Sequence, residues 1–169
     1  MFNRLAIMLI WFWGTLFTAN AMAGLPKQAY LPSDQANKAV VAAVEQCQTD
    51  GYQVSAAVVD RSGVVIAHLR ADGAGAHTID SSKNKAYTSA SLKEPTQKLA
   101  KLITKIPEIV ALRDMNEQIL LLGGGFPIRI GNEVVGGIGV GGAPGAHLDE
   151  VCARAGLKVL NAELYKAEN

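Results

Sequence analysis

The side chains that could carry out chemistry form no recognisable catalytic set in this sequence. Ser81 and Ser82 lack the G-x-S-x-G context that presents a nucleophilic serine at a strand-to-helix turn. The histidines His68, His77 and His147 include no pair at the H-E-x-x-H spacing that binds zinc on one helix face. No two carboxylates can be placed across a cleft. Any enzymatic activity would therefore depend on a bound cofactor.

A glycine pattern near the end of the chain is typical of dinucleotide-binding proteins. Gly137, Gly139 and Gly142 have the G-x-G-x-x-G spacing, after an expected strand and before an expected helix. A Rossmann site also needs a second parallel strand with an acidic residue at its end. Here the helix is expected over residues 148–165, so Glu163 lies on a helix. We interpret the glycines as positions where the backbone turns or packs closely.

Cys47 and Cys152 are the two cysteines of the chain. Each lies on an expected helix, and in an oxidising compartment such a pair can form a disulfide. The alternative is that both are small, buried hydrophobic residues. They lack the close Cys/His spacing of a zinc site. Both alternatives for the pair stay open at this point.

Residues 1–23 have the features of a secretory signal peptide. Arg4 gives a short basic region, residues 5–17 form an apolar run, and residues 21–23 read Ala-Met-Ala, the form of a cleavage site. The run is too short for a membrane-spanning helix, which needs about 20 apolar residues. An uncleaved anchor is the alternative. We expect cleavage after Ala23 and a periplasmic or secreted protein without a stable membrane span.

The remaining residues, 24–169, have the length of one ordinary domain. Without Arg4 they hold equal numbers of basic and acidic side chains, so no basic patch argues for nucleic-acid binding. Low net charge with much Ala, Val and Gly is typical of a protein that buries surface against copies of itself. We therefore expect a homo-oligomer that binds no nucleic acid.

Hydrophobic periodicity predicts the order helix, two strands, helices, three strands, helix. The first helix is expected to open with Ser33 as its N-cap and to end at Asp50-Gly51. The five strands are expected over residues 53–59, 64–69, 119–122, 126–130 and 134–140. The later helices are expected over residues 80–89, 96–104, 107–112 and 148–165.

This order predicts an α+β fold. Short hairpins make the paired strands antiparallel. The strands are apolar nearly throughout, as in residues 54–59. Helices or a partner subunit must therefore cover both faces of the sheet.

Several short motifs, taken together, resemble one known family. They are AAVVDRSG at residues 56–63, RADGA at 70–74, KAYT at 85–88, GVGG at 139–142, DE at 149–150 and ARAGL at 153–157. From about residue 36 to residue 160 the chain resembles the GlcG/HbpS family, also called the haem-degrading domain family. Two departures are His147-Leu148, where relatives more often carry a polar residue such as Gln, and a long stretch over residues 107–116.

The resemblance implies a profilin-like α/β/α sandwich with a five-stranded antiparallel sheet. The family looks functionally mixed, with secreted haem-binding proteins, domains fused to corrinoid adenosyltransferases, and proteins encoded beside glycolate genes. Many relatives form symmetric oligomers. A secreted member looks like an oligomeric protein that binds haem or a related tetrapyrrole. The alternatives are an enzyme or accessory factor acting on a small anionic metabolite, in hydroxy-acid or corrinoid metabolism, and a scaffold whose main property is assembly.

A haem site needs an axial donor, an apolar slot and cations for the propionates. His77, on the flexible loop before the second expected helix, is the expected metal ligand. His68 is expected to be an ordinary strand residue and His147 an ordinary helix-start residue. Tyr87 and Met115 are weaker alternatives, expected to be packing residues.

The rest of the expected binding site surrounds Lys85, which belongs to the KAYT motif. Its ammonium group is expected to face the negative charge of a ligand, the alternative being a solvated helix lysine. Asp149 and Glu150 are expected to stabilise the first turn of the last helix, with ligand or subunit contact as the alternative. Gly123, Gly124, Gly125 and Pro127 are expected to shape the neighbouring cleft wall, the alternative being a subunit interface.

Overall fold

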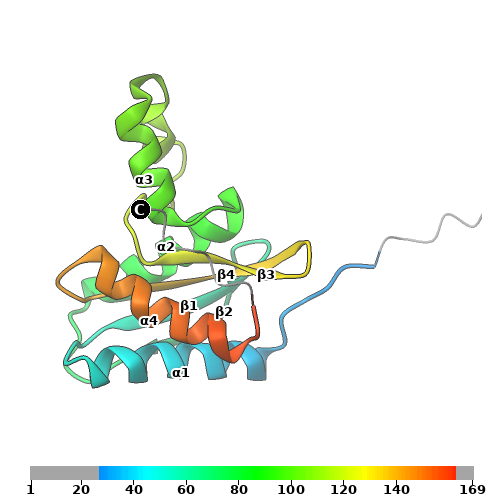
Figure 1. Ribbon diagram of the computed structural model, residues 1–169, viewed down its shortest axis with the longest axis vertical. Coiled ribbons are helices and arrows are strands. Elements are labelled where there is room, and N and C mark those ends of the chain that lie inside the picture. The colour runs from blue at the N-terminus through cyan, green and yellow to red at the C-terminus, as the bar shows by residue number, and fades with distance from the viewer. Residues whose placement is uncertain (1–26, 163–169) are drawn as a thin grey trace, which may run out of the picture.

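The computed structural model describes residues 27–162, so the predicted signal peptide at residues 1–23 lies outside the described residues. One four-stranded sheet lies between helices on its two faces (Figure 1). The elements are α1 (Ser33–Thr49), β1 (Ser55–Asp60), β2 (Val65–Arg70), α2 (His77–Leu92), α3 (Thr96–Lys105), the 3-10 helix η1 (Pro107–Asp114), β3 (Gly125–Ile130), β4 (Glu133–Gly141) and α4 (Ala146–Val159).

The sheet has the strand order β2-β1-β4-β3, and every neighbouring pair is antiparallel. The sheet consists of two tight hairpins, β1–β2 and β3–β4. The central strands β1 and β4 pair with each other and so connect the two hairpins. The register places Ser55 opposite Gly141 and Asp60 opposite Gly136. Both hairpin turns therefore lie at one end of the sheet, and the start of β1 lies with the end of β4 at the other. The predicted α+β fold with antiparallel strands is confirmed.

The prediction of five strands is wrong, because residues 119–122 form no strand. The Leu120 backbone N–H donates to the Thr88 hydroxyl at 2.8 Å. The Leu122 carbonyl accepts from the Thr96 hydroxyl at 2.7 Å. This apolar segment thus bonds to side chains of α2 and α3 instead of a neighbouring strand, a choice that its composition does not reveal.

The helices α1 and α4 lie side by side on one face of the sheet (Figure 1). Their buried residues join those of the sheet in the main hydrophobic core. Cys47 of α1 and Cys152 of α4 are both buried in this core and form a disulfide. The structure thereby decides between the two alternatives that the sequence left open.

The opposite face of the sheet is covered by α2, which lies directly on β4. A side chain at Gly137 would collide with the Ala86 carbonyl, and one at Gly139 would collide with the Ser82 carbonyl. Glycine at both positions allows the helix backbone to approach the strand backbone closely. The interpretation of the G-x-G-x-x-G spacing as close packing is therefore confirmed for these two positions.

Several predicted helix boundaries differ from the structure. Ser33, the predicted N-cap, is instead the first residue of α1. Pro32 occupies the N-cap position, where its carbonyl accepts the first helical hydrogen bond from the Ala36 N–H, and it has no polar side chain to cap the helix. The helix α4 ends at Val159, before the predicted end at residue 165. Asn161 adopts a left-handed φ of 51°, a conformation that interrupts a helix.

The helix α3 and the 3-10 helix η1 form an arm, residues 96–114, that projects from the body of the domain (Figure 1). No residue of η1 is buried, and α3 buries only Thr96 and Leu99. The arm contains most of the stretch that is longer than expected for the family. Within residues 27–162, no helix is both long and apolar enough to cross a bilayer.

Candidate functional site

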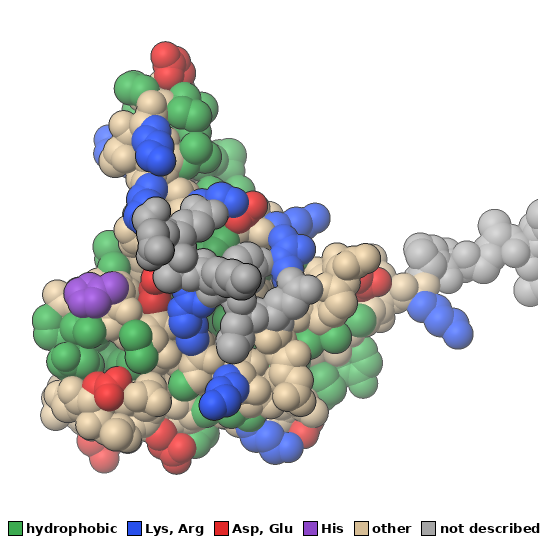
Figure 2. All heavy atoms as spheres, in the orientation of Figure 1, with side chains coloured by type: hydrophobic (Ala, Val, Ile, Leu, Met, Phe, Trp, Pro, Cys, Tyr) green, Lys and Arg blue, Asp and Glu red, His purple; other side chains and the backbone are tan. Residues whose placement is uncertain are grey.

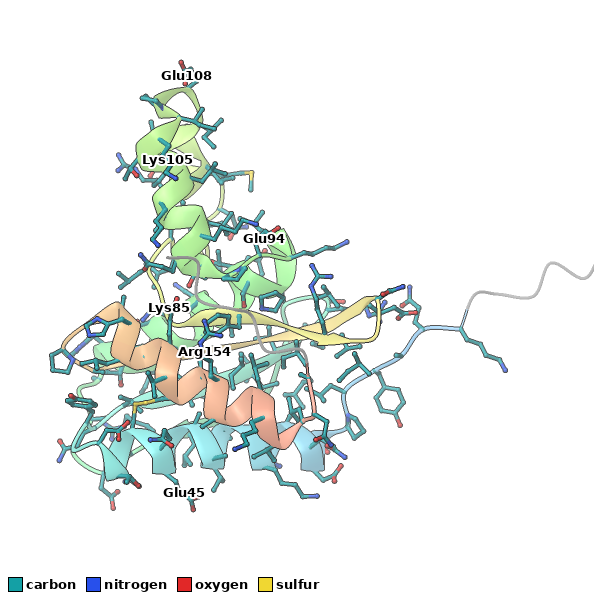
Figure 3. All side chains as sticks on the ribbon, in the orientation of Figure 1. Glu45, Lys85, Glu94, Lys105, Glu108 and Arg154 are labelled. Carbon is teal, nitrogen blue, oxygen red and sulfur yellow. A yellow bond between two sulfur atoms is a disulfide. The ribbon has the colours of Figure 1, made fainter. Side chains whose placement is uncertain are left out.

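A buried ion pair lies where the end of β4 meets the start of α4. The Lys85 ammonium group donates to the Asp149 carboxylate at 2.7 Å and to the Val140 carbonyl at 2.9 Å. The two residues are only 1% and 3% exposed. The second Asp149 oxygen accepts the Ala143 N–H at 3.0 Å. The pair therefore connects α2, β4 and α4 through the interior (Figure 3).

This arrangement corrects the expectation for Lys85. Lys85 is neither a solvated lysine nor open to a ligand, because α2 points its side chain under the glycine turn and toward α4. Asp149 lies in the first turn of α4, as expected, and its oxygens also bond to Lys85 and to the loop before the helix. The charge of each side chain is thus compensated within the protein, as burial requires.

The glycine turn at residues 123–125 closes over this ion pair. Gly124 has a φ of 114°, and a side chain there would lie 2.7 Å from the Val140 carbonyl oxygen and 3.0 Å from Lys85 Nζ. A side chain at Gly123 would collide with Gln97 of α3. Pro127, also expected in a cleft wall, is buried in β3 opposite Gly137. Glycine at 124 is therefore needed, both for its positive φ and for close packing against the Val140 carbonyl.

Burial raises the pKa of the Asp149 carboxyl group above its ordinary value, and the Lys85 charge partly opposes this shift. Burial also raises the pKa of Glu150, against the lowering influence of Arg154, Lys101, Lys85 and His147. The Arg154 guanidinium lies 4.5 Å from the centre of the Phe126 ring. Charged groups of α3 and α4 thus gather around Glu150 at the base of the arm.

The structure does not bring the other expected site residues to the Lys85 pair. His77 is exposed at the first residue of α2, about 12 Å along the helix from Lys85 for eight residues of rise. Tyr87 is half-buried and packs against Gly63 in the β1–β2 turn. His77 and Tyr87 therefore lie toward opposite ends of α2.

The remaining histidines have different surroundings. His68 of β2 forms a hydrogen bond with Ser82 of α2, with 3.1 Å between the His68 Nε2 and the Ser82 hydroxyl oxygen. Partial burial and the nearby Lys83 charge lower the pKa of His68, which favours its neutral form. His147 is exposed in the first turn of α4. In the described range, no three His, Cys, Asp or Glu side chains are grouped so as to hold a metal ion.

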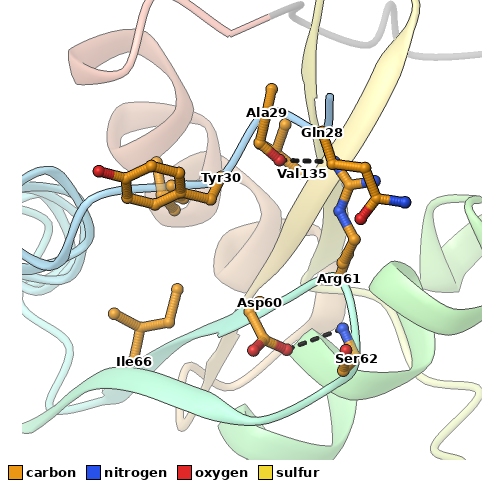
Figure 4. A pocket seen from close by; sticks show the side chains of 9 residues that line it. Gln28, Ala29, Tyr30, Asp60, Arg61, Ser62, Ile66 and Val135 are labelled. Carbon is orange, nitrogen blue, oxygen red and sulfur yellow. Dashed lines mark hydrogen bonds between the residues drawn. The ribbon is translucent and has the colours of Figure 1, made fainter. Parts of the chain in front are cut away.

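Two surface pockets lie at the hairpin end of the sheet, a location that the sequence did not suggest. One has a volume of about 490 Å³ and is lined by Tyr30, Ile66 and Val135 together with residues of the β1–β2 turn (Figure 4). The second adjoins it, since both include Gln28 and Arg61. No local motif marks either pocket, because their residues come from segments that are far apart in the sequence.

Comparisons with known proteins agree with this architecture. The family model for "Haem degrading protein HbpS-like" matches residues 31–158. A crystal structure of HbpS has 44% sequence identity and a TM-score of 0.75, over 81% of this chain and 94% of that one. A double mutant of HbpS from Streptomyces reticuli has 40% identity and a TM-score of 0.75, over 93% and 99%.

One further solved structure shares the fold, and one curated protein is similar in sequence. The protein ORFY of Klebsiella pneumoniae has 27% identity and a TM-score of 0.75, over 82% of this chain and 97% of its own. A curated relative, an uncharacterised 15.0 kDa protein from the dhaT-dhaS intergenic region of Citrobacter freundii, is 34% identical over 86 residues. That match covers 50% of this chain and 61% of the relative. Since the family model matches nearly all of the described domain, the resemblance is confirmed and this chain belongs to the HbpS-like family of haem-degrading proteins.

Proposed function

We propose that this protein binds haem, or a related tetrapyrrole, as a periplasmic or secreted homo-oligomer. The observation that carries the proposal is the 44% identity to HbpS over most of both chains, together with the family match. PduOC, at 21% identity and a TM-score of 0.74, has the same fold and was solved as a haem complex. The signal-peptide features of residues 1–23 support the proposed location.

His77 is the residue that we propose as the axial ligand. A porphyrin supplies its own equatorial ligands, so the protein needs to provide only an axial donor such as an imidazole. The His77 ring is exposed at the start of a helix that packs firmly on the sheet. His68, by contrast, already interacts with Ser82. Bound haem would supply the iron and its redox chemistry.

Assembly of copies is the second part of the proposal. Apolar side chains gather on the arm (Figure 2), where the exposed residues include Leu102, Ile106 and Val110. Met115, directly after the arm, is 62% exposed. Exposed apolar surface of this kind is commonly buried against a partner, and closed symmetric homo-oligomers are the usual outcome. A second copy of this chain is the proposed occupant.

A haem titration of the purified protein tests the ligand. We expect a saturable shift of the Soret band when haem is added. The shift should be smaller in His77→Ala and unchanged in His147→Ala. The two substitutions remove equivalent rings from exposed helix starts, so their comparison separates ligation from general changes of the surface. Binding no stronger than to an unrelated protein would refute the proposal.

A further inference from the structure

The second pocket at the hairpin end of the sheet, here called the basic pocket, collects positive charge from four separate segments. It has a volume of about 550 Å³. Its described lining residues are Lys27, Gln28, Arg61, Lys93, Arg129, Asn132, Glu133 and Val134. They come from the chain before α1, the β1–β2 turn, the end of α2 and the β3–β4 hairpin.

Two of the cationic groups are held in place by hydrogen bonds to the backbone. The Arg61 guanidinium donates to the Ala29 carbonyl at 2.6 Å, a contact visible in Figure 4, and to Glu133 at 3.2 Å. The Arg129 guanidinium donates to the Lys93 carbonyl at 3.0 Å. Such contacts fix the position of a guanidinium group before any ligand arrives, which reduces the entropy lost on binding.

The described lining of the basic pocket contains four cations and one carboxylate, a formal charge of +3. This local excess contrasts with the balanced charge of residues 24–169. Like charges that line one concave surface repel each other, and a multivalent anion would relieve that repulsion. Arginine side chains also match the planar geometry of carboxylate and phosphate groups.

We propose that the basic pocket is a binding site for a small polyanion that carries two or more carboxylate or phosphate groups. The opening is large enough for a ligand of several non-hydrogen atoms, and the cations line it from different directions. The site lies at the end of the sheet away from His77 and from the Lys85–Asp149 pair. The proposal is therefore independent of haem binding.

Calorimetric titration with citrate at low ionic strength tests the site. We expect saturable binding that weakens as salt is added, because the interaction is between exposed charges. Lys27→Gln combined with Lys93→Gln should weaken citrate binding by at least about tenfold, the effect of losing roughly one charge-assisted contact. Lys105→Gln combined with Lys158→Gln removes the same charge from exposed positions elsewhere and should leave the affinity unchanged.

Glu133→Gln provides a test of opposite sign. It removes the carboxylate from the pocket, so citrate should bind more tightly, a result that mere disruption of the pocket would not produce. Thermal unfolding of each variant checks that the fold is retained. No saturable citrate binding to the original protein, or equal weakening in the two double variants, would overturn the proposal.

A competition experiment tests whether the basic pocket is separate from the proposed haem site. Haem affinity that stays the same at saturating citrate would support a separate site for a small polyanion. Inhibition of haem binding by citrate would overturn the placement of the polyanion away from His77. Failure of haem binding with intact citrate binding would refute only the proposed haem function, and the reverse result would refute only the basic pocket.

Discussion

Lys85 of α2 and Asp149 of α4 form a buried ion pair with a separation of 2.7 Å, although they are 64 positions apart in the sequence. The contact joins the helix on one face of the sheet to the start of the helix on the other. It passes the end of β4, whose Val140 carbonyl accepts a second bond from Lys85. The pair therefore acts as a structural link between the two helical layers.

Replacing one partner of this pair should destabilise the fold strongly. Lys85→Met leaves the Asp149 carboxylate buried without its cation, and we expect a loss of about 3–5 kcal/mol in the free energy of unfolding. Adding Asp149→Asn to that variant should recover part of the loss, because no uncompensated charge then remains. Urea denaturation measures both effects. A loss below about 1 kcal/mol in the single variant would show that the pair is not structural.

The raised pKa of Glu150 predicts a pH dependence of stability. The folded protein holds the Glu150 proton to a higher pH than the unfolded chain does, whose ordinary value is 4.5. The contribution of Glu150 to stability is therefore complete below about pH 4.5 and is lost as the pH rises through the folded value. Glutamine at position 150 does not titrate. The original protein should therefore lose stability relative to Glu150→Gln as the pH rises above about 4.5, and urea denaturation at several pH values measures this loss.

Glu45→Gln is a suitable control for this experiment. Glu45 is exposed on α1, and its replacement should leave the shape of the stability curve unchanged. A direct NMR titration that gives Glu150 a pKa below 4.5 would contradict the assignment.

The disulfide should contribute substantially to stability. It closes a loop between residues 105 positions apart, so it restricts the unfolded chain considerably. Cys47→Ala combined with Cys152→Ala should lower the free energy of unfolding by about 2–5 kcal/mol. A reducing agent should lower the melting temperature of the original protein and leave that of the double variant unchanged. Equal responses of the two proteins would contradict a disulfide between these residues.

Charges on the arm should disrupt the proposed assembly. Leu102→Lys combined with Val110→Lys places two cations on exposed apolar positions of α3 and η1. Light scattering should then show the monomer mass where the original protein shows a larger one. Val41→Lys, a similarly exposed site on α1, should retain the larger mass. A monomeric original protein, or an unchanged mass in the arm variant, would exclude the arm as the interface.

The sequence by itself determined the local elements and the family. Both hairpins, the helix stripe of Ala36, Val40, Ala43 and Val44, and the close packing at Gly137 and Gly139 follow from patterns between near neighbours. These patterns depend on periodicity and turn chemistry, which operate over a few residues. The α+β fold was therefore predictable, whereas membership of the HbpS-like family followed from the resemblance of the short motifs at residues 56–63, 70–74, 85–88, 139–142 and 153–157.

Only the tertiary structure decided the partners of particular side chains. Residues 119–122 look like a strand, yet they bond to Thr88 and Thr96. Lys85 looks like an exposed helix lysine, yet it reaches Asp149 across the end of the sheet. The basic pocket joins cations from four segments that share no motif. In each case the outcome depends on how the helices pack on the sheet. That packing brings together residues that are far apart in the sequence, and no pattern between near neighbours connects them.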